Sequence, residues 1–168
     1  MLGERLAAAG LADRFVCPFL SPVPFEAMAS AEAALADAEG PTVVVGSSLG
    51  GYYATWLAEK HDLRAVLINP AVMAPVLLSS LVGTHTNFHT GVSFEFTFEH
   101  VEQLLALSAA TVSSARYLLL VETGDEVLDY RQAVERYAGS RQVVLEGGDH
   151  SFTRFPELVP QIIEFCGL

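Results

Sequence analysis

Three side chains of this sequence could together carry out acyl transfer: the hydroxyl of Ser48, the carboxylate of Asp125 and the imidazole of His150. A serine hydroxyl is a poor nucleophile until a base removes its proton during attack, and an imidazole can do so near neutral pH. A carboxylate bonded to the other ring nitrogen fixes the tautomer and stabilises the protonated ring. We therefore expect Ser48 as nucleophile, His150 as general base and Asp125 as the acid that orients it.

Ser48 stands at the centre of the pentapeptide Gly46–Gly50, which has the pattern G-x-S-x-G. The β-branched run Thr42–Val45 precedes it and predicts a buried strand, while helical spacing follows as far as Lys60. A strand, a sharp turn and a helix are the context of a nucleophile elbow. We expect a Cβ at Gly46 or at Gly50 to crowd the crossing of strand and helix. The pentapeptide alone is weak evidence, since an ordinary glycine-rich turn has the same letters.

The backbone N–H of Leu49, the residue after the nucleophile, is the expected donor to a developing oxyanion. Other interpretations of the acidic residues stay open from the sequence. Asp129 could supply the carboxylate in place of Asp125, and Asp149 is expected to be a turn residue. His150 could instead cap the last helix. Two aromatic residues that follow the elbow, Tyr52 and Tyr53, are expected to pack in the core rather than take part in chemistry.

Apolar runs alternate with helical patterns along the chain, which indicates a parallel sheet covered on both faces. We predict an α/β fold, a three-layer α/β/α sandwich with a mainly parallel sheet of about five strands. The strands are expected at 14–17, 42–45, 64–70, 117–122 and 142–145. Because ligands bind at the carboxyl ends of such strands, Ser48, Asp125 and His150, which lie in the turns after three of them, are expected to meet there.

The 168 residues are expected to form one domain, residues 1–168, in which 71–109 is a lid-like insertion. Within it, Val92–Phe98 alternates like a hairpin strand or a lid edge. Four phenylalanines could line an apolar wall or simply pack in the core: Phe88, Phe94, Phe96 and Phe98. Three histidines form no recognisable metal-ligand set and are expected on the lid or surface: His85, His89 and His100.

Composition narrows the possible partners. The formal net charge of −11 disfavours nucleic acid and anionic membrane surfaces, because both would repel the chain. There is no apolar run long enough to span a membrane and no signal-peptide pattern. Cys17 and Cys166 lie far apart and match no metal spacing, so we expect two free, buried thiols in a reducing cytoplasm. Nucleic acid and a membrane span are therefore not expected for this chain.

Four segments together resemble the small bacterial YqiA/YcfP-type esterases of the α/β-hydrolase superfamily. They are Val45–Leu57, Asn69–Ala71, Thr123–Arg131 and Glu146–Phe152. The resemblance implies a serine esterase or thioesterase that acts on acyl substrates without a metal or cofactor. It also implies the same roles for Ser48, Asp125 and His150.

One part of the family pattern is missing from this sequence. Members of that family begin with an apolar strand that runs into a His-Gly-Phe loop, whose N–H is the second oxyanion donor. This sequence has no His-Gly pair, and Met1 falls within the helix that would follow. Either residues precede Met1 in the native protein, or the strand is lacking and its neighbours, 14–17 and 42–45, pair directly. The second explanation implies a catalytically impaired or non-catalytic hydrolase-fold protein, and an exposed seam would make a dimer possible.

Overall fold

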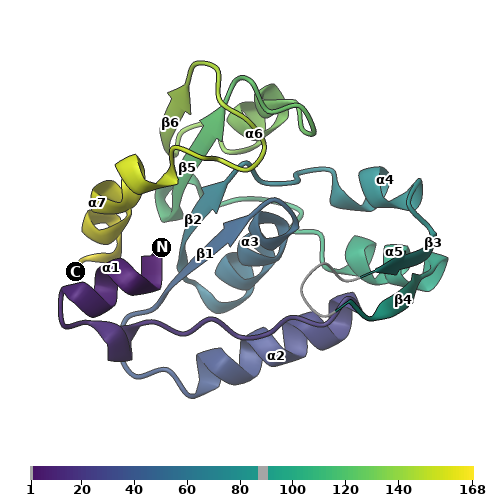
Figure 1. Ribbon diagram of the computed structural model, residues 1–168, viewed down its shortest axis with the longest axis horizontal. Helices are drawn as coiled ribbons and strands as arrows, with labels where there is room; N and C mark the ends of the chain where they lie inside the picture. The colour runs from purple at the N-terminus through teal and green to yellow at the C-terminus, as the bar shows by residue number, and fades with distance from the viewer. Residues whose placement is uncertain (1, 87–90) are drawn as a thin grey trace.

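The computed structural model describes residues 2–86 and 91–168, and its centre is a four-stranded parallel sheet (Figure 1). The strands β1 (Val43–Ser47), β2 (Arg64–Ile68), β5 (Tyr117–Glu122) and β6 (Arg141–Leu145) lie in the order β1-β2-β5-β6. A separate antiparallel hairpin consists of β3 (Gly83–Thr86) and β4 (Ser93–Phe96). The predicted α/β class with a mainly parallel sheet is confirmed, with four strands in that sheet rather than five.

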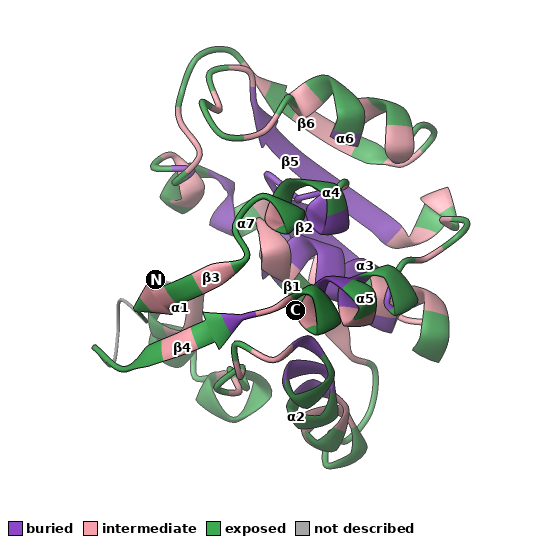
Figure 2. Cartoon of the chain, turned by 90° about the vertical axis from the view of Figure 1, so that its right-hand side faces the viewer, coloured by how far each residue is buried: buried purple, intermediate pink, exposed green. Residues whose placement is uncertain are grey.

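Helices surround the sheet. They are α1 (Leu2–Ala8), α2 (Pro24–Ala36), α3 (Leu49–His61), α4 (Ala74–Ser79), α5 (Phe98–Ala106), α6 (Tyr130–Arg136) and α7 (Phe155–Cys166), with 3-10 turns η1 (Ala12–Arg14) and η2 (Ser114–Arg116). Side chains of a strand point alternately to its two faces. Leu119 and Val121 of β5 therefore pack with α3 and α6, whereas Leu118 and Leu120 pack with α7. Every residue of β5 is buried, as Figure 2 shows.

Helix α3 is covered on two sides, because α2, α4 and α5 pack against its outer face. This explains why α3 has buried residues around most of its circumference instead of one apolar stripe. Tyr52 and Tyr53 both lie in this cluster, as predicted, and the Tyr52 hydroxyl donates to the carbonyl of Leu104 at 2.7 Å. The elbow helix is thus held firmly between the sheet and a further helical layer.

The predicted strand at 14–17 is wrong. After η1, residues 15–21 belong to no strand, and Val16 and Phe19 are 68% and 67% exposed. Within the described residues β1 pairs with β2 alone, so the segment does not pair with β1 either. An apolar run becomes a strand only where a neighbouring strand satisfies its backbone groups, and the described part of the chain places none beside 14–17.

The insertion 71–109 folds as α4, the β3–β4 hairpin and α5. The hairpin reading of Val92–Phe98 is confirmed, with His85 opposite Phe94. Phe96 is buried in the core, whereas Phe98 is 69% exposed; Phe88 and His89 lie outside the described residues. The lid-like role of the insertion stays a prediction.

The two cysteines correct another expectation. Both are free thiols, but Cys17 is exposed and Cys166 is half-buried, so the predicted burial of both is wrong. Cys17 belongs to the segment that forms no strand and therefore lies outside the core. Among the described helices none is long and apolar enough to cross a membrane. The cytoplasmic location and the possible dimer stay predictions.

Candidate active site

Ser48 occupies a strained turn between β1 and α3. Its φ is +53° and its ψ is −122°, a backbone conformation that non-glycine residues rarely adopt. Among its backbone hydrogen bonds, two tie it to the end of β2 and the turn that follows: the Ser48 N–H donates to the Ile68 carbonyl, and the Ser48 carbonyl accepts from the Ala71 N–H, both at 3.0 Å. The turn therefore has the geometry of a nucleophile elbow.

The steric need for glycine near Ser48 agrees with the prediction at Gly46 but not at Gly50. A Cβ on Gly46 would lie 2.1 Å from the carbonyl oxygen of Gly50, so Gly46 is required as expected. A Cβ on Gly50 would meet nothing within 4 Å, so the expected crowding at Gly50 is wrong. The second close approach is at Gly51, where a Cβ would lie 2.7 Å from the Cβ of Pro70. The helix thus packs on the turn after β2 through Gly51.

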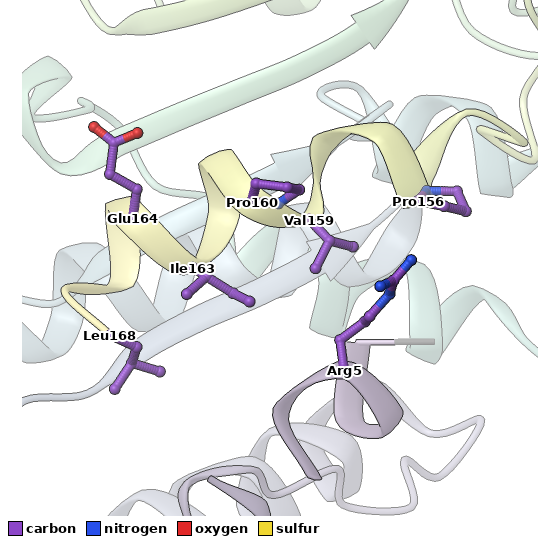
Figure 3. A pocket seen from close by; sticks show the side chains of 7 residues that line it. All are labelled: Arg5, Pro156, Val159, Pro160, Ile163, Glu164 and Leu168. Atoms are coloured by element: carbon purple, nitrogen blue, oxygen red, sulfur yellow. The ribbon is translucent and has the colours of Figure 1, made fainter. Parts of the chain in front are cut away.

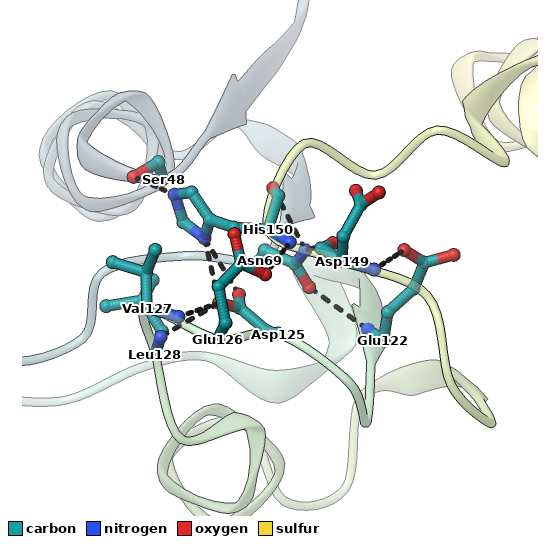
Figure 4. A network of polar contacts seen from close by, with 9 residues as sticks. All are labelled: Ser48, Asn69, Glu122, Asp125, Glu126, Val127, Leu128, Asp149 and His150. Carbon is teal, nitrogen blue, oxygen red and sulfur yellow. Dashed lines mark hydrogen bonds and ion pairs between the residues drawn. The ribbon is translucent and has the colours of Figure 1, made fainter.

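The structure brings the three predicted side chains into one hydrogen-bonded line (Figure 4). His150 Nε2 lies 3.0 Å from Ser48 Oγ, and His150 Nδ1 lies 2.9 Å from Asp125 Oδ2. If Nδ1 donates to the carboxylate, Nε2 is left with a lone pair that faces the serine hydroxyl. The imidazole is therefore placed to accept the Ser48 proton.

The carboxylate of Asp125 is held from both sides. Its side chain is 2% exposed, and Oδ1 accepts the N–H groups of Val127 and Leu128 at 2.9 and 2.8 Å. The backbone donors fix the orientation of the carboxylate, and both of its oxygens lie within hydrogen-bond distance of His150 Nδ1, Oδ1 at 3.0 Å and Oδ2 at 2.9 Å. This is the arrangement of a carboxylate that orients an imidazole.

The backbone of His150 is held as firmly as its ring. Its N–H donates to Glu126 Oε2 at 2.9 Å, and its carbonyl accepts from Asn69 Nδ2 at 3.3 Å. The His150 N–H also holds the pKa of the Glu126 carboxyl below its ordinary value, because the bond favours the charged form. Every polar group of His150 thus has a partner, which leaves the residue little freedom to turn away from Ser48.

The alternative residues do not join this line. Asp129 caps α6, where its side chain accepts the Arg131 N–H at 3.0 Å. Asp149 contributes only backbone groups to the contacts around His150, and its Oδ1 has no partner among the described residues. His85 contacts the Leu81 carbonyl, and His100 accepts the Thr97 N–H in the cap of α5. Asp125 is thus the carboxylate that meets His150.

Leu49 is the first residue of α3, so its N–H is one of those that a helix start leaves without an intrahelical acceptor. That position beside Ser48 is the one an oxyanion donor occupies. Its role stays a prediction.

Three residues at the site were not expected from the sequence: Asn69, Glu122 and Glu126. Asn69 directly follows β2, and Glu122 ends the otherwise apolar strand β5. A charged residue that ends a buried strand at the carboxyl edge was a usable signal. The hydrogen-bond partner of Glu122 could not be predicted from the sequence, because it lies in the loop after β6.

A groove between α1 and α7 has a volume of about 510 Å³ (Figure 3). It is lined by Arg5, Pro156, Val159, Pro160, Ile163, Glu164 and Leu168. None of the three site residues lines it, so it is not the substrate pocket of this site. Within the part of the chain that the structure describes, no group of three or more His, Cys, Asp or Glu side chains could hold a metal ion.

A family model described as the uncharacterised protein family UPF0227 matches residues 2–167. The chain belongs to UPF0227. This family includes the YqiA-type proteins, so the resemblance seen in the sequence is confirmed.

Solved structures similar to the UPF0227 chain are α/β-hydrolases. The mouse alpha/beta hydrolase domain-containing protein 10 is 18% identical, with 84% of this chain and 68% of that chain covered and a TM-score of 0.59. Est1E from Butyrivibrio proteoclasticus is 14% identical, with coverages of 87% and 72% and a TM-score of 0.61. The esterase domain of a Rhodothermus marinus protein is 16% identical, with coverages of 96% and 78% and a TM-score of 0.61. At these identities the likeness shows the α/β-hydrolase fold.

Proposed function

We propose that this UPF0227 chain hydrolyses acyl esters or acyl thioesters through an acyl-enzyme on Ser48. The observation that carries the proposal is the line of contacts from Asp125 through His150 to Ser48, at 2.9 and 3.0 Å. The structural neighbour named as an esterase domain supports the reaction class.

The geometry suggests how each step would run. Ser48 Oγ attacks the acyl carbon while His150 Nε2 takes the hydroxyl proton, and Asp125 stabilises the imidazolium. The N–H of Leu49 donates to the oxyanion. Collapse of the tetrahedral intermediate expels the alcohol or thiol, which takes the proton from His150. Water then attacks the acyl-enzyme with His150 as base again, which releases the acid and restores Ser48.

Labelling with a fluorophosphonate tests the nucleophile. We expect the wild type to react and Ser48→Ala not to react. Ser47→Ala is the matched control, because Ser47 is an exposed neighbouring serine on β1, and it should label like the wild type. Equal labelling of wild type and Ser48→Ala would reject Ser48 as an activated nucleophile.

A second candidate is a hydrolase-fold protein that binds acyl compounds without turning them over. It is suggested by the lack of a His-Gly pair in the sequence, because that pair supplies the second oxyanion donor in the family pattern. Turnover of a short acyl nitrophenyl ester that disappears in His150→Ala would exclude this candidate. Labelling of Ser48 without any turnover of esters or thioesters would favour it.

A further inference from the structure

The turn Asn69–Ala71 follows β2 and lies between Ser48 and His150, although no step of the proposed mechanism uses it. On the Ser48 side, the Ala71 N–H donates to the Ser48 carbonyl at 3.0 Å. Pro70 lies so close to α3 that a Cβ on Gly51 would be 2.7 Å from the Pro70 Cβ. This turn is therefore in direct contact with the elbow.

On the other side, the Asn69 side chain holds the loop that carries His150 (Figure 4). Its Nδ2 donates to the carbonyls of Asp149 and His150 at 3.1 and 3.3 Å. Its Oδ1 accepts the Glu122 N–H at 3.0 Å. Asn69 is 2% exposed, so all of these bonds lie away from water. One amide thus joins the ends of β2 and β5 to the loop after β6.

Glu122 holds the same loop from its other side. The side chain is fully buried, and its Oε2 accepts the Asp149 N–H at 2.9 Å. Its Oε1 has no partner among the described residues. A buried acceptor that is left without its donor, or a donor without its acceptor, is unfavourable. Asn69 thus binds the carbonyl of Asp149 and Glu122 binds its N–H. Both backbone polar groups of the residue before His150 are therefore held.

We propose that Asn69 is a positioning residue that sets the separation of Ser48 Oγ and His150 Nε2, and that Glu122 assists it. The turn contacts the Ser48 backbone and the His150 backbone at once, so a shift of the turn changes their spacing. A displacement of about 1 Å between reacting groups can lower a rate about 10²-fold. The kinetic part of this inference rests on the proposed function, whereas the structural part does not.

Asparagine suits this position for a second reason. Its φ is +38°, on the left-handed side, where asparagine is better tolerated than most residues. Asn69→Gly therefore relieves the backbone while it removes the side chain. Asn69→Asp keeps the size of the side chain and the oxygen that accepts the Glu122 N–H. It replaces the NH₂ group that donates to the carbonyls of Asp149 and His150 with a second oxygen. A loss seen in both variants cannot come from backbone strain.

Steady-state kinetics on an acyl nitrophenyl ester is the first measurement. We expect kcat to fall about 10²-fold in Asn69→Asp and in Asn69→Gly with little change in KM, because the chemistry and not the binding is affected. Glu122→Gln keeps an acceptor oxygen and should stay close to the wild type, whereas Glu122→Ala should lose kcat. Tyr137→Phe is the control: it removes a buried bond to Thr55 elsewhere in the core and should lower stability but not kcat.

The second measurement does not need activity. Proton NMR of the wild type should show the His150 Nδ1–H downfield because it donates to Asp125, and Asp125→Ala assigns the signal. We expect the signal to broaden or vanish in Asn69→Asp and Asn69→Gly, and to persist in Glu122→Gln and Tyr137→Phe. If neither Asn69 variant folds, the contrast between Glu122→Ala and Glu122→Gln carries the test.

The outcomes separate the two proposals. Folded Asn69 variants with wild-type kcat and an unchanged Nδ1–H signal would overturn the inference. An equal fall of kcat in Tyr137→Phe would do so as well, because the loss would then follow stability alone. A wild type that neither labels nor turns over, yet loses the Nδ1–H signal in the Asn69 variants, would refute the proposed function and leave the positioning role standing.

Discussion

Replacing Gly148 by alanine measures how closely the loop that carries His150 packs on Glu122. The φ of Gly148 is +77°, and a Cβ there would lie 2.2 Å from the carboxyl carbon of Glu122. Its neighbour Gly147 has a φ of +73°, but a Cβ there would meet nothing within 4 Å. The two variants therefore share the backbone penalty and differ in the steric contact.

The magnitudes follow from these two terms. An alanine in the left-handed region costs about 1–2 kcal/mol, which is the loss expected for Gly147→Ala. Overpacking adds about 1–3 kcal/mol. We thus expect Gly148→Ala to lower the free energy of unfolding by about 2–5 kcal/mol. The loop has little room to move away from Glu122, because its backbone also packs closely on Gly124. A Cβ on Gly124 would lie only 2.5 Å from the Gly148 carbonyl oxygen.

Urea unfolding of both variants at equal protein concentration is the assay, with m checked for constancy. The double variant Glu122→Ala/Gly148→Ala should be less destabilised than the sum of its parts, by about 1–3 kcal/mol, because removal of the carboxylate leaves room for the methyl group. Equal losses for Gly147→Ala and Gly148→Ala, or strict additivity in the double variant, would refute the reasoning.

Three further predictions concern the elbow, the acid of the site and the far end of the sheet. Gly46→Ala should abolish fluorophosphonate labelling, whereas Gly50→Ala should label normally, since only the first Cβ would strike backbone. Asp125→Asn should lower kcat about 10⁴-fold through the wrong imidazole tautomer, while thermal melting stays close to wild type because the amide oxygen keeps both backbone bonds. Glu59 lies on α3. Burial raises the pKa of its carboxyl, but hydrogen bonds to the carboxylate, above all the one from the Ser113 N–H, lower the pKa more, so that it lies below 4.5. A lowered carboxyl pKa stabilises the folded protein above pH 4.5, and this stabilisation is lost as the pH falls. Glu59→Gln should therefore lower the free energy of unfolding in urea at neutral pH, and lower it less in acid.

Much of this fold could be predicted because local pattern and tertiary structure agree. The runs at β2, β5 and β6 are apolar and end at Pro, Gly or acidic residues, so their carboxyl ends were readable. Strand ends of a parallel sheet share one edge, which is why the meeting of Ser48, Asp125 and His150 could be predicted from residues more than 20 positions apart. Local sequence was sufficient there.

The failures have a common cause, which is dependence on a partner distant in sequence. Residues 14–17 have the composition of a strand, but no strand among the described residues lies beside them. Gly50 looked sterically required, yet the close contacts belong to Gly46 and Gly51. The role of Asn69 depends on carbonyls about 80 residues later in the chain. Apart from the contact of Gly46 with Gly50, these contacts join separate segments of the chain.

In the part of the chain that the structure describes, β1 pairs only with β2, and this has a consequence for hydrogen exchange. The Ser48 N–H donates to β2, and successive residues of a strand direct their amides to opposite sides. The amides of Val44 and Gly46 then face β2, while those of Val43, Val45 and Ser47 face outward. Exchange with deuterium should therefore alternate between slow and fast along this strand. A second chain that paired with the outer edge of β1 would slow the exchange of these three fast amides and leave the exchange of Val44 and Gly46 unchanged. The exchange pattern would therefore detect such binding.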